Sequence, residues 1–154
     1  MRDFSLSLPM SLLRAREAVM ALFRPPLRQH GLSEQQWRVL RALASVGAME
    51  TSELAGVAFL LGPSLSRILN DLETRQLIER RVIVADRRRT GIAISRQGLA
   101  LIEAIAPTSE QIYAEIAGRF GVRKLARLHE MLGALERDLA ELPAARMARK
   151  NQAD

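Results

Sequence analysis

The sequence predicts a mainly α-helical subunit with a small β-wing: a winged helix-turn-helix with a helical dimerisation region (α+β minor). Three observations predict it. Apolar residues recur at helical spacing at both ends of the 154-residue chain, the period changes to that of strands after residue 76, and a cationic segment divides the strand-like stretch. We expect one subunit over 1–154, with dimerisation helices at about 9–30 and 96–142 and the winged helix-turn-helix at about 33–95.

The first predicted helix runs through Leu12 and Phe23, with Ser7 or Ser11 as its cap. The pair Pro25-Pro26 should kink or end it, because proline lacks an N–H and restricts the residue before it.

The second predicted helix begins after Ser33, which forms a capping box with Gln36. Its buried side is expected to carry Trp37, Val39, Leu40 and Leu43. It should end near Gly47. The extended link Met49-Glu50 could then pair with the wing as a third strand.

The helix-turn-helix follows. Thr51 should cap a helix over 52–59, with Leu54, Ala55 and Ala58 facing inward. Gly62 is an acceptable N-cap and Pro63 a favoured first residue for the next helix. Its apolar stripe is Leu65, Ile68, Leu69 and Leu72. The opposite face carries Ser64, Ser66, Arg67, Asn70 and Asp71, whose donors and acceptors suit base edges and phosphates in a major groove.

The predicted wing has a first strand at 77–78 and 82–84 and a second at 91–95. Residues 85–90 are predicted to be its tip, and they carry Asp86, Arg87, Arg88 and Arg89. A helix with a polar face followed by a basic hairpin predicts double-stranded DNA as a partner. A solvated face and a solvated turn are the alternatives. For Arg80 and Arg81, phosphate contact and protection of a strand edge stay open.

Two long helices should complete the chain. Ser95 is expected to cap the first from about Arg96, Pro107 to bend it, and Gly121 to separate it from a helix over 122–142. One winged module cannot cover all this apolar surface, so we expect a two-fold homodimer. Its reading helices would lie roughly 34 Å apart and demand a palindromic operator.

Composition narrows the function classes. Lys and Arg number 23 against 17 Asp and Glu, a net charge of +6 that favours an anionic partner without choosing nucleic acid over membrane. There is no cysteine and aromatics are 4%, which excludes thiol chemistry and disfavours a base-stacking platform. No apolar run suits a membrane span, and Arg14, Arg16 and Glu17 interrupt any signal-like stretch, so a cytoplasmic protein is expected.

Neither metal nor enzyme chemistry is indicated. His30 and His129 have no second ligand at metal spacing, and no nucleophile elbow or phosphate-cradling glycine loop is present. We expect no cofactor, no metal and no catalytic residues.

Three stretches are informative beyond the order of the elements: PSLSRILNDLETRQLIERR, Asp86-Arg87-Arg88-Arg89 and IAISRQGLAL. On these stretches and that order, the chain resembles the MarR family of bacterial transcriptional regulators from about Leu12 to Leu142. LLRAREAVMALFRP and HGLSEQQWRVLR narrow the resemblance to repressors of aromatic-acid catabolism. It implies a homodimeric repressor that a small aromatic carboxylate releases from its operator. Arg88 would enter the minor groove and Asp86 would orient the wing. Ser64, Ser66, Arg67 and Asn70 fall at the positions that face the major groove.

The resemblance also implies a ligand cleft between the second helix and the partner's first helix. Arg16 would meet the carboxylate, with His30, Trp37 and Arg41 as lining. A salt bridge within a helix or between subunits is the alternative for Arg16. The chain departs from the family pattern twice, with Gln76 where glycine is frequent and Gly62 where a polar or basic residue is common.

Two rival functions stay open: a DNA-coating protein without sequence preference or effector, and a helical protein that binds membranes or an acidic partner. The Ser64/Arg67/Asn70 face lacks bulky apolar anchors, which argues against membrane insertion.

Overall fold

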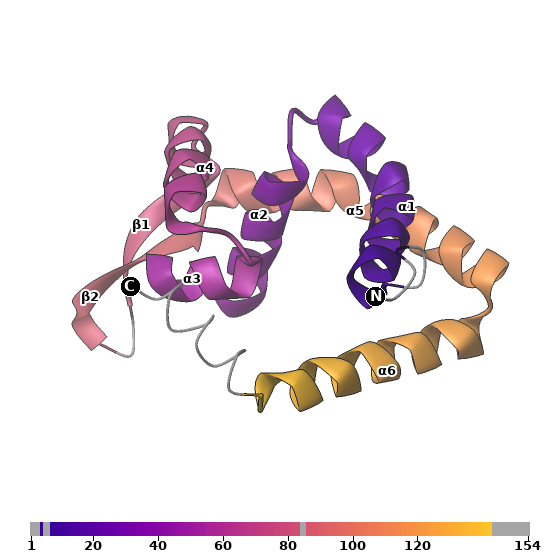
Figure 1. The fold of residues 1–154 in the computed structure, drawn as a ribbon. Coiled ribbons are helices and arrows are strands. Elements are labelled where there is room, and N and C mark those ends of the chain that lie inside the picture. The colour runs from indigo at the N-terminus through magenta and orange to yellow at the C-terminus, as the bar shows by residue number, and fades with distance from the viewer. Residues whose placement is uncertain (1–3, 5–6, 84–85, 143–154) are drawn as a thin grey trace.

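The computed structural model describes residues 4, 7–83 and 86–142; the side chains of residues 82–90 are outside that description. The elements are α1 (Leu8–Gln29), α2 (Glu34–Val46), α3 (Thr51–Ala58), α4 (Gly62–Thr74), β1 (Ile78–Ile83), β2 (Asp86–Ile94), α5 (Arg96–Phe120) and α6 (Val122–Ala140). Figure 1 shows α2, α3, α4 and the hairpin at one end and α1 with α6 at the other, with α5 joining them. The mainly helical fold with a small β-wing is confirmed.

Helix α1 starts after Ser7, whose side chain makes no capping hydrogen bond, and it contains both Pro25 and Pro26. The expectation that the prolines could end the helix is wrong, since the helix continues to Gln29. Phe23 and Leu27 are buried on either side of the pair. Burial of these two side chains outweighs the backbone hydrogen bonds that two prolines remove near the end of a helix.

Helix α2 has the predicted capping box. Ser33 Oγ accepts from Gln36 N at 3.1 Å, and Ser33 N donates to Gln36 Oε1 at 2.8 Å. The helix ends at Gly47, whose φ of 89° suits glycine. Val39, Leu40 and Leu43 are fully buried, whereas Trp37 is only partly buried.

The helix-turn-helix pair buries most of the predicted inward residues. Leu54, Ala58, Leu65, Leu69 and Leu72 are core residues, whereas Ala55 and Ile68 are partly buried against that core. Helix α3 begins at Thr51, after an N-cap at Glu50, so Thr51 is the first helical residue and not the cap. Likewise Leu61, and not Gly62, is the N-cap of α4, which makes Pro63 its second residue. Both differences are one residue, within the usual spread at helix ends.

Helix α4 ends in a left-handed residue that is not glycine. Gln76 has φ of 58°, its N–H donates to Glu73 O at 2.9 Å, and Leu77 N donates to Leu72 O at 2.9 Å. This pair of bonds is the Schellman motif, in which glycine is the usual left-handed residue. The predicted strain at Gln76 is therefore present as a positive φ.

The hairpin differs from prediction. β1 and β2 pair antiparallel, with Arg81 opposite Gly91, Val82 opposite Thr90 and an irregularity between Val82 and Ile83. Residues 86–90 belong to β2, so their assignment to a loop is wrong. The assignment relied on charge, but the backbone hydrogen bonds that pair two strands do not involve the side chains, so a run of charged residues does not exclude a strand. The link pairs with the wing only through an isolated bridge between Met49 and Ile92, with N···O distances of 3.0 and 2.8 Å. Within the described residues the sheet itself has two strands, so the predicted third strand is not formed.

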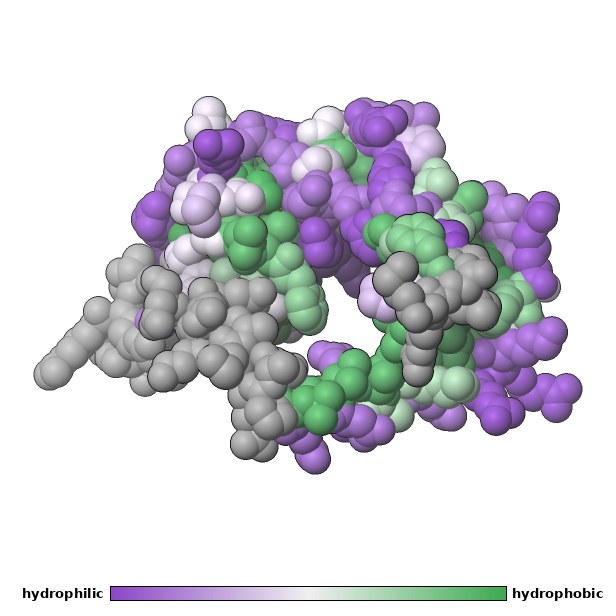
Figure 2. Space-filling view, viewed as in Figure 1, coloured by the Kyte–Doolittle hydropathy of each residue, from purple (hydrophilic) through white to green (hydrophobic). Residues whose placement is uncertain are grey.

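Helix α5 is capped by Ser95, whose Oγ accepts from Gly98 N at 3.0 Å and donates to Gln76 O at 2.6 Å. Pro107 lies inside α5, and Gly121 separates it from α6 as predicted. No residue of α6 is buried, although its seam is apolar. Figure 2 shows apolar surface along part of α6, next to an open hollow. A single subunit thus leaves a large apolar surface uncovered.

Candidate functional site

The outer face of α4 carries the polar side chains expected to contact DNA. Ser64, Ser66, Arg67 and Asn70 are all exposed, opposite the buried Leu65 stripe. Ser66 Oγ donates to Gly62 O at 3.1 Å. Arg67 forms no hydrogen bond or ion pair with any residue that the structure describes. The face is therefore polar, accessible and positively charged.

Asp71 lies on the same helix and is also exposed, but its carboxylate bonds to other residues of the subunit. Its Oδ2 accepts from Gln36 Nε2 of α2 at 2.6 Å and lies 3.4 Å from Arg75 Nη1. Arg75 Nη1 also donates to Gly31 O at 3.0 Å. These bonds tie α4 to α2 and to the α1–α2 link. Asp71 therefore positions α4 against α2. The sequence pattern did not show this role, because it placed Asp71 on the same face as the residues expected to contact DNA.

Asp86, Arg87, Arg88 and Arg89 follow one another along β2, and their side chains lie outside the described part of the chain. The described arginines of β1 are exposed and have partners within the subunit. Arg80 Nε lies 3.4 Å from Glu73 Oε1, and Arg81 Nη2 lies 2.5 Å from Glu79 Oε1. Both ion pairs are at the surface, where such pairs contribute little stability.

A cavity of about 480 Å³ lies among α1, α2 and α5. It brings together three of the four expected ligand residues, Arg16, Trp37 and Arg41. His30 is exposed at the C-cap of α1 and is not among the lining residues. The remaining lining is Val19, Met20, Phe23, Glu34, Arg38, Ala42, Ser45, Val57 and Tyr113. The cavity therefore joins an apolar and aromatic wall to several guanidinium groups.

The aromatic wall has defined geometry. The Arg41 guanidinium lies 5.8 Å from the centroid of the Trp37 ring, within cation–π range. The Phe23 and Tyr113 rings are 5.0 Å apart and tilted by 56°. The sequence analysis missed Arg38 and Tyr113 as lining. Arg38 could have been found from its position three residues before Arg41, because residues three apart share a helix face. Tyr113 lies beside Ile112 on a helix whose contact with α1 the sequence does not specify.

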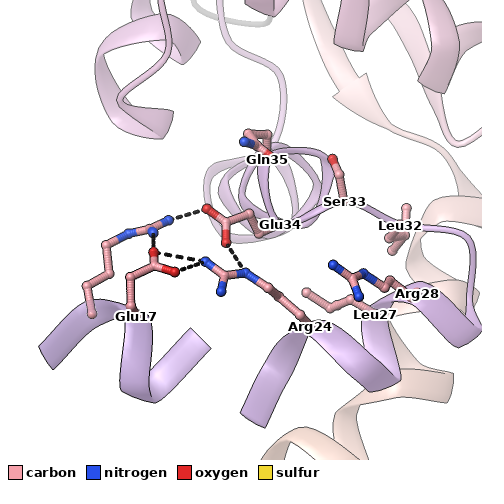
Figure 3. Close-up of a pocket in the computed structure, with 9 residues that line it drawn as sticks. Glu17, Arg24, Leu27, Arg28, Leu32, Ser33, Glu34 and Gln35 are labelled. Atoms are coloured by element: carbon pink, nitrogen blue, oxygen red, sulfur yellow. Dashed lines mark hydrogen bonds and ion pairs between the residues drawn. The ribbon is translucent and has the colours of Figure 1, made fainter. Parts of the chain in front are cut away.

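Arg16 also belongs to an ion-pair cluster, which consists of Arg16, Glu17, Arg24 and Glu34. Figure 3 shows Glu17 and Arg24 from α1 and Glu34 from α2 pointing toward one another. Arg24 reaches Glu17 Oε2 at 2.7 Å and Glu34 Oε2 at 3.1 Å, while Arg16 pairs with Glu17 at 2.8 Å and with Glu34 Oε1. The salt bridge considered as the alternative for Arg16 therefore exists within the subunit, and the same side chain lines the cavity.

The cluster shifts two pKa values. Partial burial acts to raise the pKa of Glu34, but hydrogen bonds from Arg16 and Arg24 outweigh it, so the pKa of that carboxyl is lowered. The hydrogen bond to Glu17 is the main reason that the pKa of Arg24 is raised. Both shifts favour the charged forms, so the cluster joins α1 to the start of α2 as a set of ions at neutral pH.

Within the described residues, no group of three or more His, Asp or Glu side chains could hold a metal ion. Within the same ranges, no helix combines the length and apolar character needed to cross a membrane.

The succession α2, α3, α4 and a hairpin, with α4 presenting a polar face, defines the chain as a winged helix-turn-helix protein. The MarR family model matches residues 30–89. The chain is 38% identical over 126 residues to the homoprotocatechuate degradative operon repressor of Escherichia coli, covering 82% of this chain and 85% of the relative. It is 36% identical to the HTH-type transcriptional regulator FarR of Neisseria gonorrhoeae, over 84% and 88% of the two chains. The chain belongs to the MarR family, whose regulators are dimers.

Among solved structures, NadR in complex with 4-hydroxyphenylacetate superposes with a TM-score of 0.76 at 35% identity, over 88% of this chain and 96% of NadR. The narrower resemblance that residues 12–41 suggested, to the homoprotocatechuate operon repressor, is confirmed by the identity to that protein.

Proposed function

We propose that this protein is a cytoplasmic, homodimeric repressor that binds a palindromic operator of an aromatic-acid catabolic operon. A small aromatic carboxylate binds the cavity among α1, α2 and α5 and releases the operator. The observation that carries the proposal is the joint presence, in one subunit, of an exposed polar α4 face and a cavity with aromatic walls and guanidinium groups. The protein acts by binding and catalyses no reaction.

The DNA-binding half rests on α4 and β2. Ser64, Ser66, Arg67 and Asn70 can reach base edges and phosphates, and Arg87, Arg88 and Arg89 give β2 the charge to follow the DNA backbone or enter a minor groove. A relative with 38% identity is named an operon repressor, and FarR is named an HTH-type transcriptional regulator. These names support the same class of function here.

The ligand half rests on the cavity. Trp37, Phe23 and Tyr113 offer ring surface, and the arginines offer charge-assisted hydrogen bonds to a carboxylate. NadR, at 35% identity, has been crystallised with 4-hydroxyphenylacetate, an acid of this chemical class. Ligand binding releases the operator if the ligand prefers a dimer in which the spacing of the two α4 helices does not fit the DNA. The coupling free energy between ligand and DNA binding is typically about 1–3 kcal/mol in such proteins.

We assign dimerisation to α1, α5 and α6. Exposed apolar side chains on α1 and α6 have no cover within one subunit; they include Leu8, Leu12, Leu13, Val19, Leu22, Leu128, Met131, Leu132 and Leu139. A two-fold partner that buries them would fix the distance between the two winged modules.

The test is a DNA-binding titration at fixed salt with the upstream intergenic region of the gene and with a scrambled duplex of equal length. It is repeated with homoprotocatechuate and with 4-hydroxyphenylacetate. The proposal predicts at least about a thousandfold preference for the intergenic DNA, relieved by one of the acids. Specific binding that neither acid relieves would refute this ligand class and leave the regulator. Equal affinity for both duplexes would refute the repressor and favour a DNA-coating protein.

A further inference from the structure

Arg38 is a cation with no acidic partner among the residues that the structure describes. Its Nε is buried and has no hydrogen-bond partner among the described residues, and the side chain forms no ion pair there. Buried N–H groups are nearly always paired, and an unpaired group on a charged side chain indicates that something is missing from its surroundings. Arg38 lines the cavity described above.

The acid that could serve Arg38 within the cavity is already used. Glu34 is the one carboxylate among the lining residues, which include three arginines: Arg16, Arg38 and Arg41. Its Oε1 accepts from Arg16 and its Oε2 accepts from Arg24 at 3.1 Å. The lining therefore carries more positive than negative charge, which favours an anionic ligand.

Arg38 and Arg41 are three residues apart on α2, so both point from one face of the helix. Arg41 lies over Trp37 and also forms no ion pair within the described chain. A guanidinium presents its N–H groups in a fixed fork that matches a carboxylate. Two forks on one helix face can donate to the same carboxylate, while the neighbouring rings contact the ligand's aromatic part.

We infer that Arg38 acts with Arg41 to bind the effector's carboxylate, and that Arg38 makes the cavity select aromatic acids over their neutral analogues. This rests on the proposed function, because it names how that effector is recognised. The two parts of the ligand are then bound by different residues. Trp37, Phe23 and Tyr113 contact its aromatic ring, and the two arginines bind its carboxylate.

The test measures affinity by calorimetry for the full-length dimer, using 4-hydroxyphenylacetate, homoprotocatechuate and the neutral 4-hydroxyphenylacetamide. The variants are Arg38→Met, which removes the charge and the donors, and Arg38→Lys, which keeps the charge. Arg119→Met is the matched control, since Arg119 is exposed on α5 and lines none of this cavity. Thermal unfolding and operator binding without ligand verify that each variant is folded.

For Arg38→Met we expect affinity for the acids to fall about tenfold to a hundredfold, with affinity for the amide nearly unchanged. Arg38→Lys should recover part of the loss, and Arg119→Met should match the wild type. Equal losses for acids and amide would overturn the inference and give Arg38 a structural role, such as pairing with an acid of the partner subunit. An unchanged acid affinity would overturn it as well. If the wild type binds neither acid, the proposed ligand class fails, and this inference fails with it.

Discussion

Replacing Gly98 with alanine should destabilise the protein by about 3 kcal/mol, because α5 starts in direct contact with the backbone of Leu77, the residue before β1. A Cβ on Gly98 would lie 2.2 Å from Leu77 O, 2.7 Å from Ile94 Cγ1 and 3.2 Å from Leu77 C. The first of these neighbours is a backbone carbonyl, so no side-chain rotation relieves the clash. The start of α5 must move away from the hairpin by about 1 Å, and overpacking of this kind costs about 1–3 kcal/mol.

The same movement disturbs Ser95. Ser95 N donates to Leu77 O at 3.0 Å, and Ser95 Oγ bonds both Gly98 N and Gln76 O. Loss of a helix cap costs about 1 kcal/mol, and the better helix propensity of alanine returns about the same amount. The net expectation therefore stays near the upper end of the overpacking range.

Urea unfolding followed by circular dichroism at one fixed protein concentration measures the effect. Gly56→Ala in α3 is the matched control, because a Cβ there meets nothing within 4 Å; it should stabilise by about 0.5–1 kcal/mol. A Gly98→Ala protein with the unfolding midpoint of the wild type would refute the close contact between the start of α5 and the Leu77 backbone.

Three further predictions follow from other parts of the chain. Gln76→Gly should raise the free energy of unfolding by about 1 kcal/mol, because glycine adopts the left-handed φ of 58° without strain; an equal or lower urea midpoint would contradict this. Because the pKa of Glu34 is lowered in the folded protein, its ion pairs add stability that is fully present above its ordinary value of 4.5 and is lost as pH falls through the lowered value. Glu34→Gln should thus be less stable than the wild type at pH 7, and the difference in thermal midpoint should shrink below about pH 4; a gap independent of pH would rule out the ion pairs as its cause. Arg88→Ala should weaken operator binding and reduce the dependence of log affinity on log salt by about 0.9, and an unchanged slope in a salt titration would remove Arg88 from the DNA contacts.

The fold could largely be predicted because its local signals agree with its packing. The capping box of Ser33 and Gln36, the Ser95 cap and the Leu65/Leu72 stripe each specify a helix within a few residues of sequence. The errors arose where a local signal competed with tertiary contacts. Pro25-Pro26 is a helix-ending signal that buried Phe23 and Leu27 override, and charge predicted a loop where backbone pairing extends β2 to Asp86.

The cavity was less predictable because its walls come from three helices. Arg16, Trp37 and Arg41 were chosen by resemblance, whereas the contributions of Arg38 and Tyr113 depend on how α2 and α5 pack against α1. The ion-pair cluster has the same origin, since Glu34 meets Arg24 across a distance of ten residues that spans a helix end. Spacing along one helix predicts which side chains share a face, but not what that face meets.

Gln36 uses both ends of one amide group. Its Oε1 closes the cap of α2, and its Nε2 donates to Asp71 in the last turn of α4. The first turn of α2 therefore cannot rotate without either carrying α4 with it or breaking a 2.6 Å hydrogen bond. Glu34 begins that same turn, so a single hydrogen bond from Gln36 links the turn that holds the ion-pair cluster to the last turn of α4.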